Sequence, residues 1–598
     1  MRKTIFAVLI ALMVFAGCNG KQESATDTAT TSATTPQQAA ATPAAIRLDQ
    51  GWTPAEAETF YYTPQGSQLM PYAWFLALER EDAQTLFHDN ANMAQFRYVM
   101  ASGASKENPD GLPVGFVIDS GTTEPLLTAA DDVGSPDPQR VTGPAGNERG
   151  STKWLGMTCA ACHTSEIEYG GKRFRIDGGP AMADHEMFIG AMARALEATV
   201  RDDAKFTRFA KRVLGQADTA DALNKLKSDL AAYTTSFRQA ADRNHANVAY
   251  GFARLDAFGA IFNQVTEVAL NNPANHAPSD APVSFPFLWD APALDWVQWN
   301  GSVANPLGRN VGEVMGVYGN FTLDPGPQQF SSSVRILDLD RIEQQLRKLK
   351  APAWPAADFG AIDEVKAEAG KKLYAQTCVK CHFIRDQNGA FPMTPPNKYG
   401  KQFVRTVNVS LKAIGTDTKM VDRFTRVVDP GVLRPLMNNV PKALAAKVLA
   451  VADGGVIQRS LGELKPPPTP QQMLAMIDFR DDSEQPNPIA YKARPLDGIW
   501  ATAPFLHAGS VPNLYQLLLP AKDRVKTFHV GSREFDPHDV GFSTQPFPGS
   551  FEFKTSEVGN SNAGHEGLNY TQVQDGGKNR DFTDDERRAL IEYIKTLR

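Results

Sequence analysis

The chain has 598 residues, which is too long for a single hydrophobic core and predicts two or three domains. A content of 42% hydrophobic and 21% charged residues excludes a chain that is disordered throughout. The formal net charge of −6 argues against nucleic acid as a partner, because DNA and RNA binding normally needs a basic surface. The cysteines all lie in recognisable motifs, which leaves none for a structural disulfide: Cys18, Cys159, Cys162, Cys378 and Cys381.

Residues 1–17 resemble a bacterial export signal. Two basic residues precede an apolar run over 5–16, which is too short to span a bilayer as a mature helix. The small residues before Cys18 resemble a lipobox, so we expect cleavage there and lipidation of the Cys18 sulfur. The alternative is an ordinary secretory signal with an unrelated cysteine. Asn19 follows instead of aspartate, which favours the outer membrane by resemblance to lipoprotein sorting.

The next segment, residues 18–45, is expected to be a flexible tether. From residue 21 onward it contains no aromatic residue, valine, isoleucine or leucine, so it cannot bury enough apolar surface to offset its ordering entropy. Acidic residues outnumber basic ones in the mature chain, so we expect contact with the membrane through the lipid anchor only. The expected location is the periplasm or cell envelope of a Gram-negative bacterium.

Two Cys-x-x-Cys-His motifs carry the chemistry. Their residues are Cys159, Cys162 and His163 in the first motif and Cys378, Cys381 and His382 in the second. Two thiols one turn apart can form thioethers with the vinyl groups of a haem, while the adjacent imidazole binds the iron. A thioredoxin-type or zinc motif is the alternative, but neither requires a histidine directly after the second cysteine. The pattern predicts two covalently bound c-type haems.

The first motif lies in a region of mixed secondary structure. Apolar residues alternate over 167–169 and again over 174–176, on either side of Gly170 and Gly171, which predicts a β-hairpin with a two-residue turn. Helical periodicity follows over 187–214, 220–233 and 337–349. We therefore expect one hairpin followed by several helices.

The segment 271–327 is dense in Pro, Gly, Asn and Trp, and a long structured loop of this kind is expected to line a site. Two prolines then break the chain, which places a domain boundary near 351–358. The boundary divides the body of the chain into an N-terminal haem domain over 46–355 and a C-terminal haem domain over 356–598.

The second motif follows an amphipathic helix. Apolar residues recur at helical spacing over 362–373, with Gly370 on the same run, and Thr583 and Glu586 form a capping box before a terminal helix. Two helices that carry a glycine and aromatic residues and pack across each other resemble the cytochrome c core; two unrelated surface helices are the alternative. The expected fold is mainly α, with two cytochrome c-like haem domains, long loops and a few short β-hairpins.

Short stretches along the chain match one known family, although each alone is weak: 65–67, 71–75, 111–116, 156–164, 176–180, 495–504, 531–537 and 559–566. Together with the two haem motifs, they make the chain resemble the dihaem cytochrome c peroxidase superfamily, and most closely its rubber-oxygenase-like branch. The resemblance extends from residue 52 to the end of the sequence.

This resemblance implies different tasks for the two haems. The N-terminal haem, bound by His163, would keep one face open for peroxide or dioxygen, while the C-terminal haem would have two protein ligands and pass electrons. His565 is the second ligand that the resemblance gives for the C-terminal haem. The alternatives are His507, His529 and Met437, or a surface role for His565.

Other residues receive possible roles from the same resemblance. His185 is either a removable sixth ligand of the N-terminal haem or a histidine bonded to backbone at the start of a helix. A tryptophan commonly lies between the haems in this superfamily, where its ring can relay an electron. Trp289, Trp296 and Trp299 are the candidates, and core packing is the alternative for each.

Arg309 is a further catalytic candidate beside Trp289 and Trp299. With Asn310 and Glu313 it could serve a haem propionate or deliver a proton to bound peroxide; solvated surface is the alternative. Peroxide reduction requires a proton donor near the open face of the haem, a role that an acid or amide side chain can fill.

Three functions follow. The first and preferred one is a peroxidase that reduces peroxide at the N-terminal haem, with electrons from a small periplasmic cytochrome or cupredoxin passing through the C-terminal haem. The second is a dioxygenase that cleaves the C=C bond of an apolar substrate, which an apolar distal pocket would favour. The third is a plain dihaem electron carrier, against which stands the length of chain around each motif.

Overall fold

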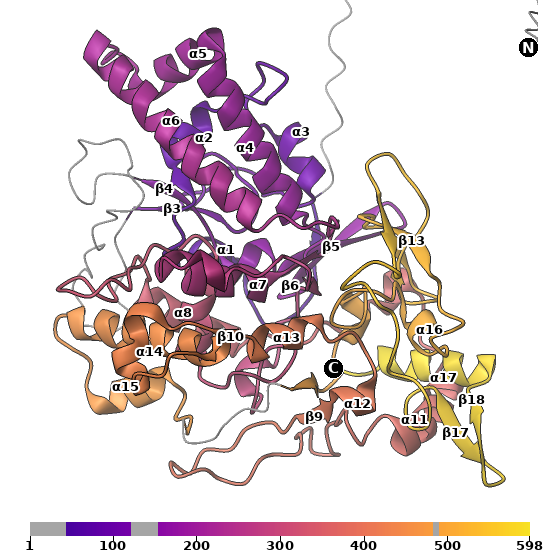
Figure 1. Cartoon of the computed structure of the whole chain (residues 1–598). Coiled ribbons are helices and arrows are strands. Elements are labelled where there is room, and N and C mark those ends of the chain that lie inside the picture. Colours follow the sequence, from indigo (N-terminus) through magenta and orange to yellow (C-terminus); the bar gives the residue numbers. More distant parts are fainter. Residues whose placement is uncertain (1–43, 121–152, 482–488) are drawn as a thin grey trace, which may run out of the picture. The chain divides into compact units, whose positions relative to one another are not determined.

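Residues 44–120, 153–481 and 489–598 are described by the computed structural model of the protein (Figure 1). Their contacts assign them to one unit that begins at Ala44. The predicted signal peptide, the lipidation site Cys18 and the tether before Ala44 lie outside the described residues. Among the helices that the structure describes, none is long and apolar enough to cross a membrane.

Helices and short strands are interspersed along the whole chain. The α-helices within the described ranges are α1 (Pro54–Tyr62), α2 (Tyr72–Ala77), α3 (Asn90–Met93), α4 (His185–Arg201), α5 (Asp203–Leu214), α6 (Ala220–Arg243), α7 (Ala257–Phe262), α8 (Pro306–Gly316), α9 (Ile336–Leu346), α10 (Ala356–Phe359), α11 (Glu364–Thr377), α12 (Leu411–Ile414), α13 (Lys419–Thr425), α14 (Ala445–Glu463), α15 (Pro470–Met476), α16 (Leu514–Leu517) and α17 (Asp584–Lys595). The strands are β1 (Ile46–Arg47), β2 (Met70–Pro71), β3 (Phe116–Asp119), β4 (Trp154–Met157), β5 (Thr164–Tyr169), β6 (Lys172–Asp177), β7 (Arg254–Leu255), β8 (Val283–Ser284), β9 (Val407–Ser410), β10 (Val427–Val428), β11 (Ala443–Leu444), β12 (Ala490–Ala493), β13 (Thr527–Val530), β14 (Phe535–Asp536), β15 (Gly541–Phe542), β16 (Phe551–Lys554), β17 (Gln572–Asp575) and β18 (Lys578–Asp581). The larger sheets have the strand orders β1-β6-β5 and β2-β4-β3, and the other strands pair in twos.

The β-hairpin predicted after the first motif is confirmed. Strands β5 and β6 pair antiparallel, with Tyr169 opposite Lys172. Gly170 and Gly171, the two turn residues, have φ angles of 57° and 75°, which a tight hairpin turn requires and which glycine adopts without strain. Strand β1 adds to β6 in parallel, so the start of the described chain is fixed beside the first motif.

Helices α4, α5 and α6 lie together at the top of Figure 1. The sequence predicts one helical segment over 187–214, but the structure breaks it at Asp202. The backbone of Asp202 is extended, and its side chain accepts hydrogen bonds from the amides of Ala204 and Lys205. A side chain that caps a new helix in this way competes with continuation of the old one.

The segment 271–327 is not a loop throughout, since it contains α8. Asn305 begins this helix and accepts hydrogen bonds from the amides of Leu307 and Gly308. The prediction that the segment lines a site is nevertheless confirmed, because residues before and within α8 face the central cavity described below.

Helices α11 and α17 cross at Gly370, as the cytochrome c-like pattern predicts. A Cβ atom on Gly370 would lie 2.0 Å from the carbonyl oxygen of Ala589, so the approach of the two helices requires glycine. Beside the crossing, the rings of Tyr374 and Tyr593 meet edge to face with their centroids 5.2 Å apart. The capping box predicted at the start of α17 is also formed.

The hydrophobic core extends across the boundary predicted near residue 355. One cluster contains Phe60 and Ile176 from the N-terminal side together with Trp500 and Leu590 from the C-terminal side. Trp354, at the boundary itself, contacts Trp500 with ring centroids 5.3 Å apart. The two Cys-x-x-Cys-His motifs therefore share one continuous hydrophobic core. The division of the chain into two haem domains at residue 355 stays a prediction.

Candidate functional site

The first motif lies in a turn directly after strand β4. This 3-10 turn covers Cys159–Ala161, and Gly115 packs against it. A Cβ atom on Gly115, whose φ is 86°, would lie 2.1 Å from the amide nitrogen of Ala161. The amide of His163 donates to the carbonyl of Cys159 at 2.9 Å, which places the imidazole and both thiols on one turn.

The second motif begins at the C-terminal end of α11. The amide of His382 donates to the carbonyl of Cys378 at 2.9 Å, the same bond as in the first motif. The hydroxyl of Tyr374 in α11 donates to the backbone oxygen of His382 at 2.9 Å. The two motifs therefore adopt the same local turn, although one follows a strand and the other follows a helix.

Both motif histidines use the same ring nitrogen for a structural hydrogen bond. Nδ1 of His163 lies 2.8 Å from the carbonyl oxygen of Pro286, and Nδ1 of His382 lies 2.8 Å from that of Arg494. A carbonyl oxygen only accepts hydrogen bonds, so each Nδ1 carries the proton and each Nε2 keeps its lone pair for a metal. This is the orientation that iron ligation requires.

The motif residues face a shared cavity of about 400 Å³. All four motif thiols are free, and burial raises the pKa of Cys159 and of Cys162 to about 12. Three basic side chains, Arg309, Lys492 and Arg494, also line the cavity. Paired thiols, an oriented imidazole and cations that can bind propionates are the donor set of a c-type haem. The residues present therefore fit the group.

His565 is the candidate ligand that lies opposite a motif histidine. The ring centroids of His382 and His565 are 6.3 Å apart. An iron bonded to one nitrogen of each ring, at the roughly 2 Å of a metal–imidazole bond, would hold the centroids about 6 Å apart. Nδ1 of His565 is buried without a hydrogen-bond partner among the described residues. Its backbone is fixed, since the amide donates to Ile414 at 2.8 Å and the carbonyl accepts from Arg524 at 3.1 Å.

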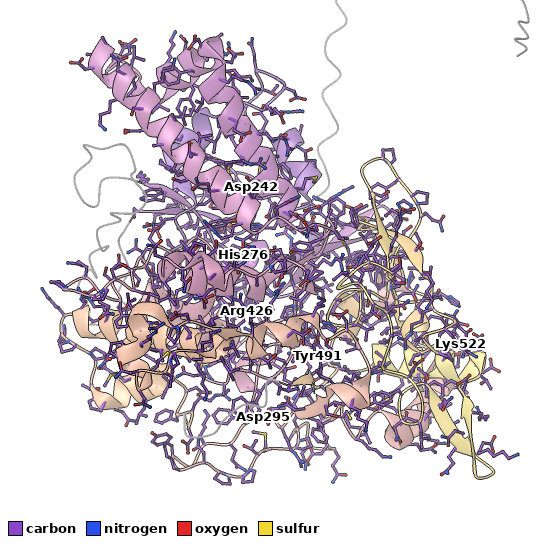
Figure 2. All side chains as sticks on the ribbon, viewed as in Figure 1. Asp242, His276, Asp295, Arg426, Tyr491 and Lys522 are labelled. Atoms are coloured by element: carbon purple, nitrogen blue, oxygen red, sulfur yellow. The ribbon has the colours of Figure 1, made fainter. Side chains whose placement is uncertain are left out.

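The alternatives to His565 lie in other surroundings. His507 lines the cavity, but its ring stacks on that of Tyr491 with the centroids 4.1 Å apart, and its Nε2 lies 2.9 Å from the Tyr491 hydroxyl. Tyr491 is labelled in Figure 2. His529 is in strand β13, where Nδ1 lies 2.9 Å from the hydroxyl of Ser550. Met437 packs against the core cluster that contains α14. Neither His507 nor His529 has a ring contact with a motif histidine in the described part of the chain.

His185 lines the cavity, but both of its ring nitrogens are engaged. Nδ1 lies 2.9 Å from the hydroxyl of Tyr98, and Nε2 lies 2.9 Å from the hydroxyl of Tyr318. Burial lowers the pKa of His185 to about 4, so the ring is neutral, with one nitrogen donating and the other accepting. The hydrogen bond at the ligating nitrogen would have to break before His185 could bind iron.

The candidate tryptophans differ in their relation to the cavity. Trp289 is fully buried outside the lining, where Nε1 donates to the carbonyl of Asp497 at 2.7 Å and the ring stacks on Phe287 at 4.5 Å. Trp299 belongs to the lining, and its Nε1 donates to the carbonyl of Ser284 at 2.9 Å. Trp296 is not among the lining residues. The structure thus brings Trp299, and not Trp289, to the cavity surface.

Helix α8 brings Arg309, Asn310 and Glu313 to the cavity. Arg309 forms a buried ion pair with Glu343. Glu313 accepts a hydrogen bond from Gln298 at 3.0 Å, and burial raises the pKa of its carboxyl group, against the opposing effect of Arg309. The cavity therefore contains a carboxyl group that holds its proton more firmly than an exposed glutamate.

Sequence reasoning missed Lys492 and Arg494 as cavity residues. Burial lowers the pKa of the Lys492 ammonium well below its usual range. Lys492 lies in β12 and Arg494 follows its last residue, Ala493, so the two are at positions i and i+2 of an extended segment, a spacing at which side chains share a face. That spacing, directly before the stretch 495–504, was the signal that could have indicated them.

The wall of the cavity near the first motif is mainly apolar. The lining side chains from α7 and from the end of α8 include Phe258, Ile261, Val314 and Val317. Residues 283–287 continue this apolar surface towards His163, apart from Ser284. The cavity therefore combines an apolar wall with polar groups such as Arg309, Glu313 and Gln298, a combination that is usual for a small-molecule site.

Comparisons with known proteins agree with a haem protein. Residues 490–529 match the family described as "RoxA-like, cytochrome c-like". The chain is 35% identical over 584 residues to "Uncharacterized protein y4iJ" of Sinorhizobium fredii (strain NBRC 101917 / NGR234), across 92% of this chain and 93% of that protein. It is also 26% identical over 328 residues to "Uncharacterized protein y4iM" of the same strain, across 52% of this chain and 63% of that protein.

The site and the matched segment together define a cytochrome c-like protein with a c-type haem and its iron. The matched residues 490–529 contain Lys492, Arg494 and His507, so the match falls on the cavity wall itself. In family terms, the chain belongs to the family of the y4iJ protein, with which it shares nearly its full length.

Proposed function

We propose that the protein is an exported dihaem c-type oxidoreductase that reduces peroxide at its N-terminal haem. The observation that carries the proposal is the unequal surroundings of the two motif histidines. His382 has a second imidazole 6.3 Å away, whereas His163 has Phe285 as its ring neighbour in the described residues. One iron would then be closed by two protein ligands, and the other would keep a face for a small molecule.

Glu313 is the residue best placed to supply a proton at the open face. Its carboxyl group lies in the cavity, its pKa is raised by burial, and Gln298 fixes its orientation. The haem iron, when bound, would supply the electrons that cleave the O–O bond of peroxide. The protein must deliver the proton, and a buried carboxylic acid can do so near neutral pH.

The electron donor would be a small periplasmic protein, a cytochrome or a cupredoxin, and the C-terminal haem would pass its electrons on. The export signal and the lipid anchor on Cys18, preferably in the outer membrane, belong to the same proposal. Trp299 and Arg309, which line the cavity, are the other side chains proposed to act there, and Trp289 would act through Phe287.

A dioxygenase acting on an apolar olefin is the second candidate. The apolar wall formed by Phe258, Ile261, Val314 and Val317 favours it, because such a wall can hold a hydrocarbon and gives little help to charge separation in peroxide. The match to a RoxA-like family points in the same direction.

The deciding experiment uses the purified full-length holoprotein. Mass spectrometry should give the added mass of two haems. Turnover is then measured with hydrogen peroxide and a reduced small cytochrome, and oxygen uptake is measured separately with an isoprenoid. Peroxide-dependent donor oxidation without oxygen uptake supports the peroxidase. Oxygen uptake with cleavage of the isoprenoid supports the dioxygenase. If neither iron binds cyanide or carbon monoxide, only the electron carrier is left.

A further inference from the structure

The two carbonyl groups that orient the motif histidines lie on two chain segments, and one side chain, that of Arg494, connects these segments by hydrogen bonds. Pro286 provides the carbonyl for His163, and Arg494 provides the carbonyl for His382. The guanidinium group of the same Arg494 donates from Nη1 to the carbonyl of Phe287 at 2.8 Å and from Nη2 to that of Trp289 at 2.6 Å. The next residue after Pro286 is therefore tied to the residue that holds the other histidine.

Several further contacts make this tie rigid. The guanidinium lies over the ring of Phe287, with Cζ 3.6 Å from the centroid, and Phe287 in turn stacks on Trp289. Trp289 returns the connection, because its Nε1 donates to the carbonyl of Asp497. Segments 286–289 and 494–497 thus hold each other at both ends, although they are more than 200 residues apart in the sequence.

We infer that Arg494 is a positioning residue that couples the two haems. The inference rests on the proposed function, since it assumes a haem at each motif. The connection runs from Nδ1 of His163 through the Pro286 carbonyl and the peptide to Phe287, then through the guanidinium and main chain of Arg494 to Nδ1 of His382. A hydrogen bond to Nδ1 strengthens the imidazole as a ligand and fixes its plane, so both irons depend on one guanidinium.

Arg494 would also be part of the route for electrons between the haems. In that step one electron would pass from a ferrous haem held at His382, which would become ferric, to a ferric haem held at His163, which would become ferrous. No proton is taken up or released. The candidate tryptophans are then less direct, because Trp289 contacts Arg494 itself only through its backbone carbonyl, while its ring contacts are the stack on Phe287 and the hydrogen bond to Asp497.

The chain offers a closely matched control. Arg480 is buried, donates to two carbonyls, those of Asp295 at 2.8 Å and Pro292 at 3.1 Å, and lies 3.6 Å over the ring of Phe403. Asp295 is labelled in Figure 2. Arg480 does not line the cavity. Its carbonyl partners, Asp295 and Pro292, are not next in sequence to Pro286 or Arg494, the residues that orient the motif histidines. Arg494→Lys and Arg480→Lys each remove a buried guanidinium that donates to two backbone carbonyls and lies over a phenylalanine ring.

The first measurement is a spectroelectrochemical titration of the holoproteins. Loosening both carbonyls weakens both imidazole ligands, so Arg494→Lys should raise the midpoint potentials of both haems, whereas Arg480→Lys should leave both unchanged. A shift at the His382 haem alone, or equal shifts in the Arg480 variant, would overturn the coupling. The midpoint potentials are measured without peroxide or oxygen turnover, so they test the coupling independently of the proposed activity.

The second measurement follows the electron directly. Carbon monoxide is bound to the reduced open haem while the other haem is oxidised, and a flash releases it, so that an electron moves back to the haem at His382. The rate should fall about tenfold in Arg494→Lys, the lower end of the usual effect of losing an outer-shell contact. If that variant loads fewer than two haems, Phe287→Leu replaces it and should slow transfer in the same direction; an unchanged rate there would overturn the inference.

Discussion

The two motif histidines are oriented in the same way but face different neighbours. Each donates from Nδ1 to a backbone carbonyl at 2.8 Å. His382 then meets the imidazole of His565, while His185, the histidine in the cavity near the first motif, is held by two tyrosines. The comparison teaches that the surroundings of each motif histidine are set by long-range packing, because the motif turns themselves are alike; we expect the number of protein ligands at each motif to follow from it.

The largest expected effect is on the closed haem. Removal of the second imidazole in His565→Ala should convert the C-terminal haem from low spin to high spin, since no other candidate ligand has a ring contact with His382 in the described residues. Optical and EPR spectra of the ferric holoprotein measure this change. His529→Ala is the control, because that side chain pairs with Ser550 in β13. An unchanged spectrum for His565→Ala would assign the ligand elsewhere.

The second prediction concerns the open haem. Glu313→Gln keeps the shape of the side chain but removes its acidic proton, so kcat/KM for peroxide should fall by roughly 10²–10⁴-fold. Because burial raises the pKa of Glu313, the acid is protonated below that raised pKa and wild-type activity should decline as the pH rises through it. That decline should be missing in Glu313→Gln. Asp453→Asn, another buried acid with a raised pKa but outside the cavity lining, should leave peroxide turnover intact.

The third prediction tests the helix crossing that supports the second motif. In Gly370→Ala the new methyl group meets the carbonyl of Ala589, and overpacking of this kind costs about 1–3 kcal/mol of unfolding free energy. Gly454→Ala in α14, with no atom within 4 Å of its Cβ position, should instead stabilise by about 0.5–1 kcal/mol. Chemical denaturation followed at the haem band measures both. Equal values for the two variants would contradict the close crossing.

The smallest expected effect is at the first motif. Tyr318→Phe removes one hydrogen bond to His185 and should lower the unfolding free energy by about 1 kcal/mol, while the N-terminal haem stays open to carbon monoxide. Phenylalanine at the exposed Tyr399 provides the comparison. Loss of carbon monoxide binding in Tyr318→Phe would show that a freed His185 closes the iron, and the contrast between the two sites would then depend on that hydroxyl.

The sequence was most informative where local pattern decides the structure. The motif turns, the hairpin at Gly170 and Gly171 and the capping box at the start of α17 follow from residues close together in the chain. The Gly370 crossing was also predictable, because a glycine beside aromatic residues indicates close helix packing. The break at Asp202 was missed, since helical periodicity continues through it and only the capping side chain reveals the end.

The cavity residues were harder to predict because distant segments build them. Arg494 meets Phe287 and Trp289 only in the folded chain, and the two tyrosines beside His185 come from positions 98 and 318. The choice among His565, His507 and His529 was open for the same reason: each follows a plausible local stretch, and their difference appears only as a distance to His382. Local patterns cannot express such distances.

The meeting of α11 with α17 also links the far end of the described chain to the second motif. The face of α11 around Gly370 and Tyr374 packs against Ala589 and Tyr593 of α17, and the Tyr374 hydroxyl in turn supports the backbone of His382. A polypeptide released or clipped before Asp584 would expose that face and leave the turn at Cys378 without its neighbour. We therefore expect a variant truncated before Asp584 to attach less haem at Cys378 and Cys381 while the turn at Cys159 keeps its own surroundings.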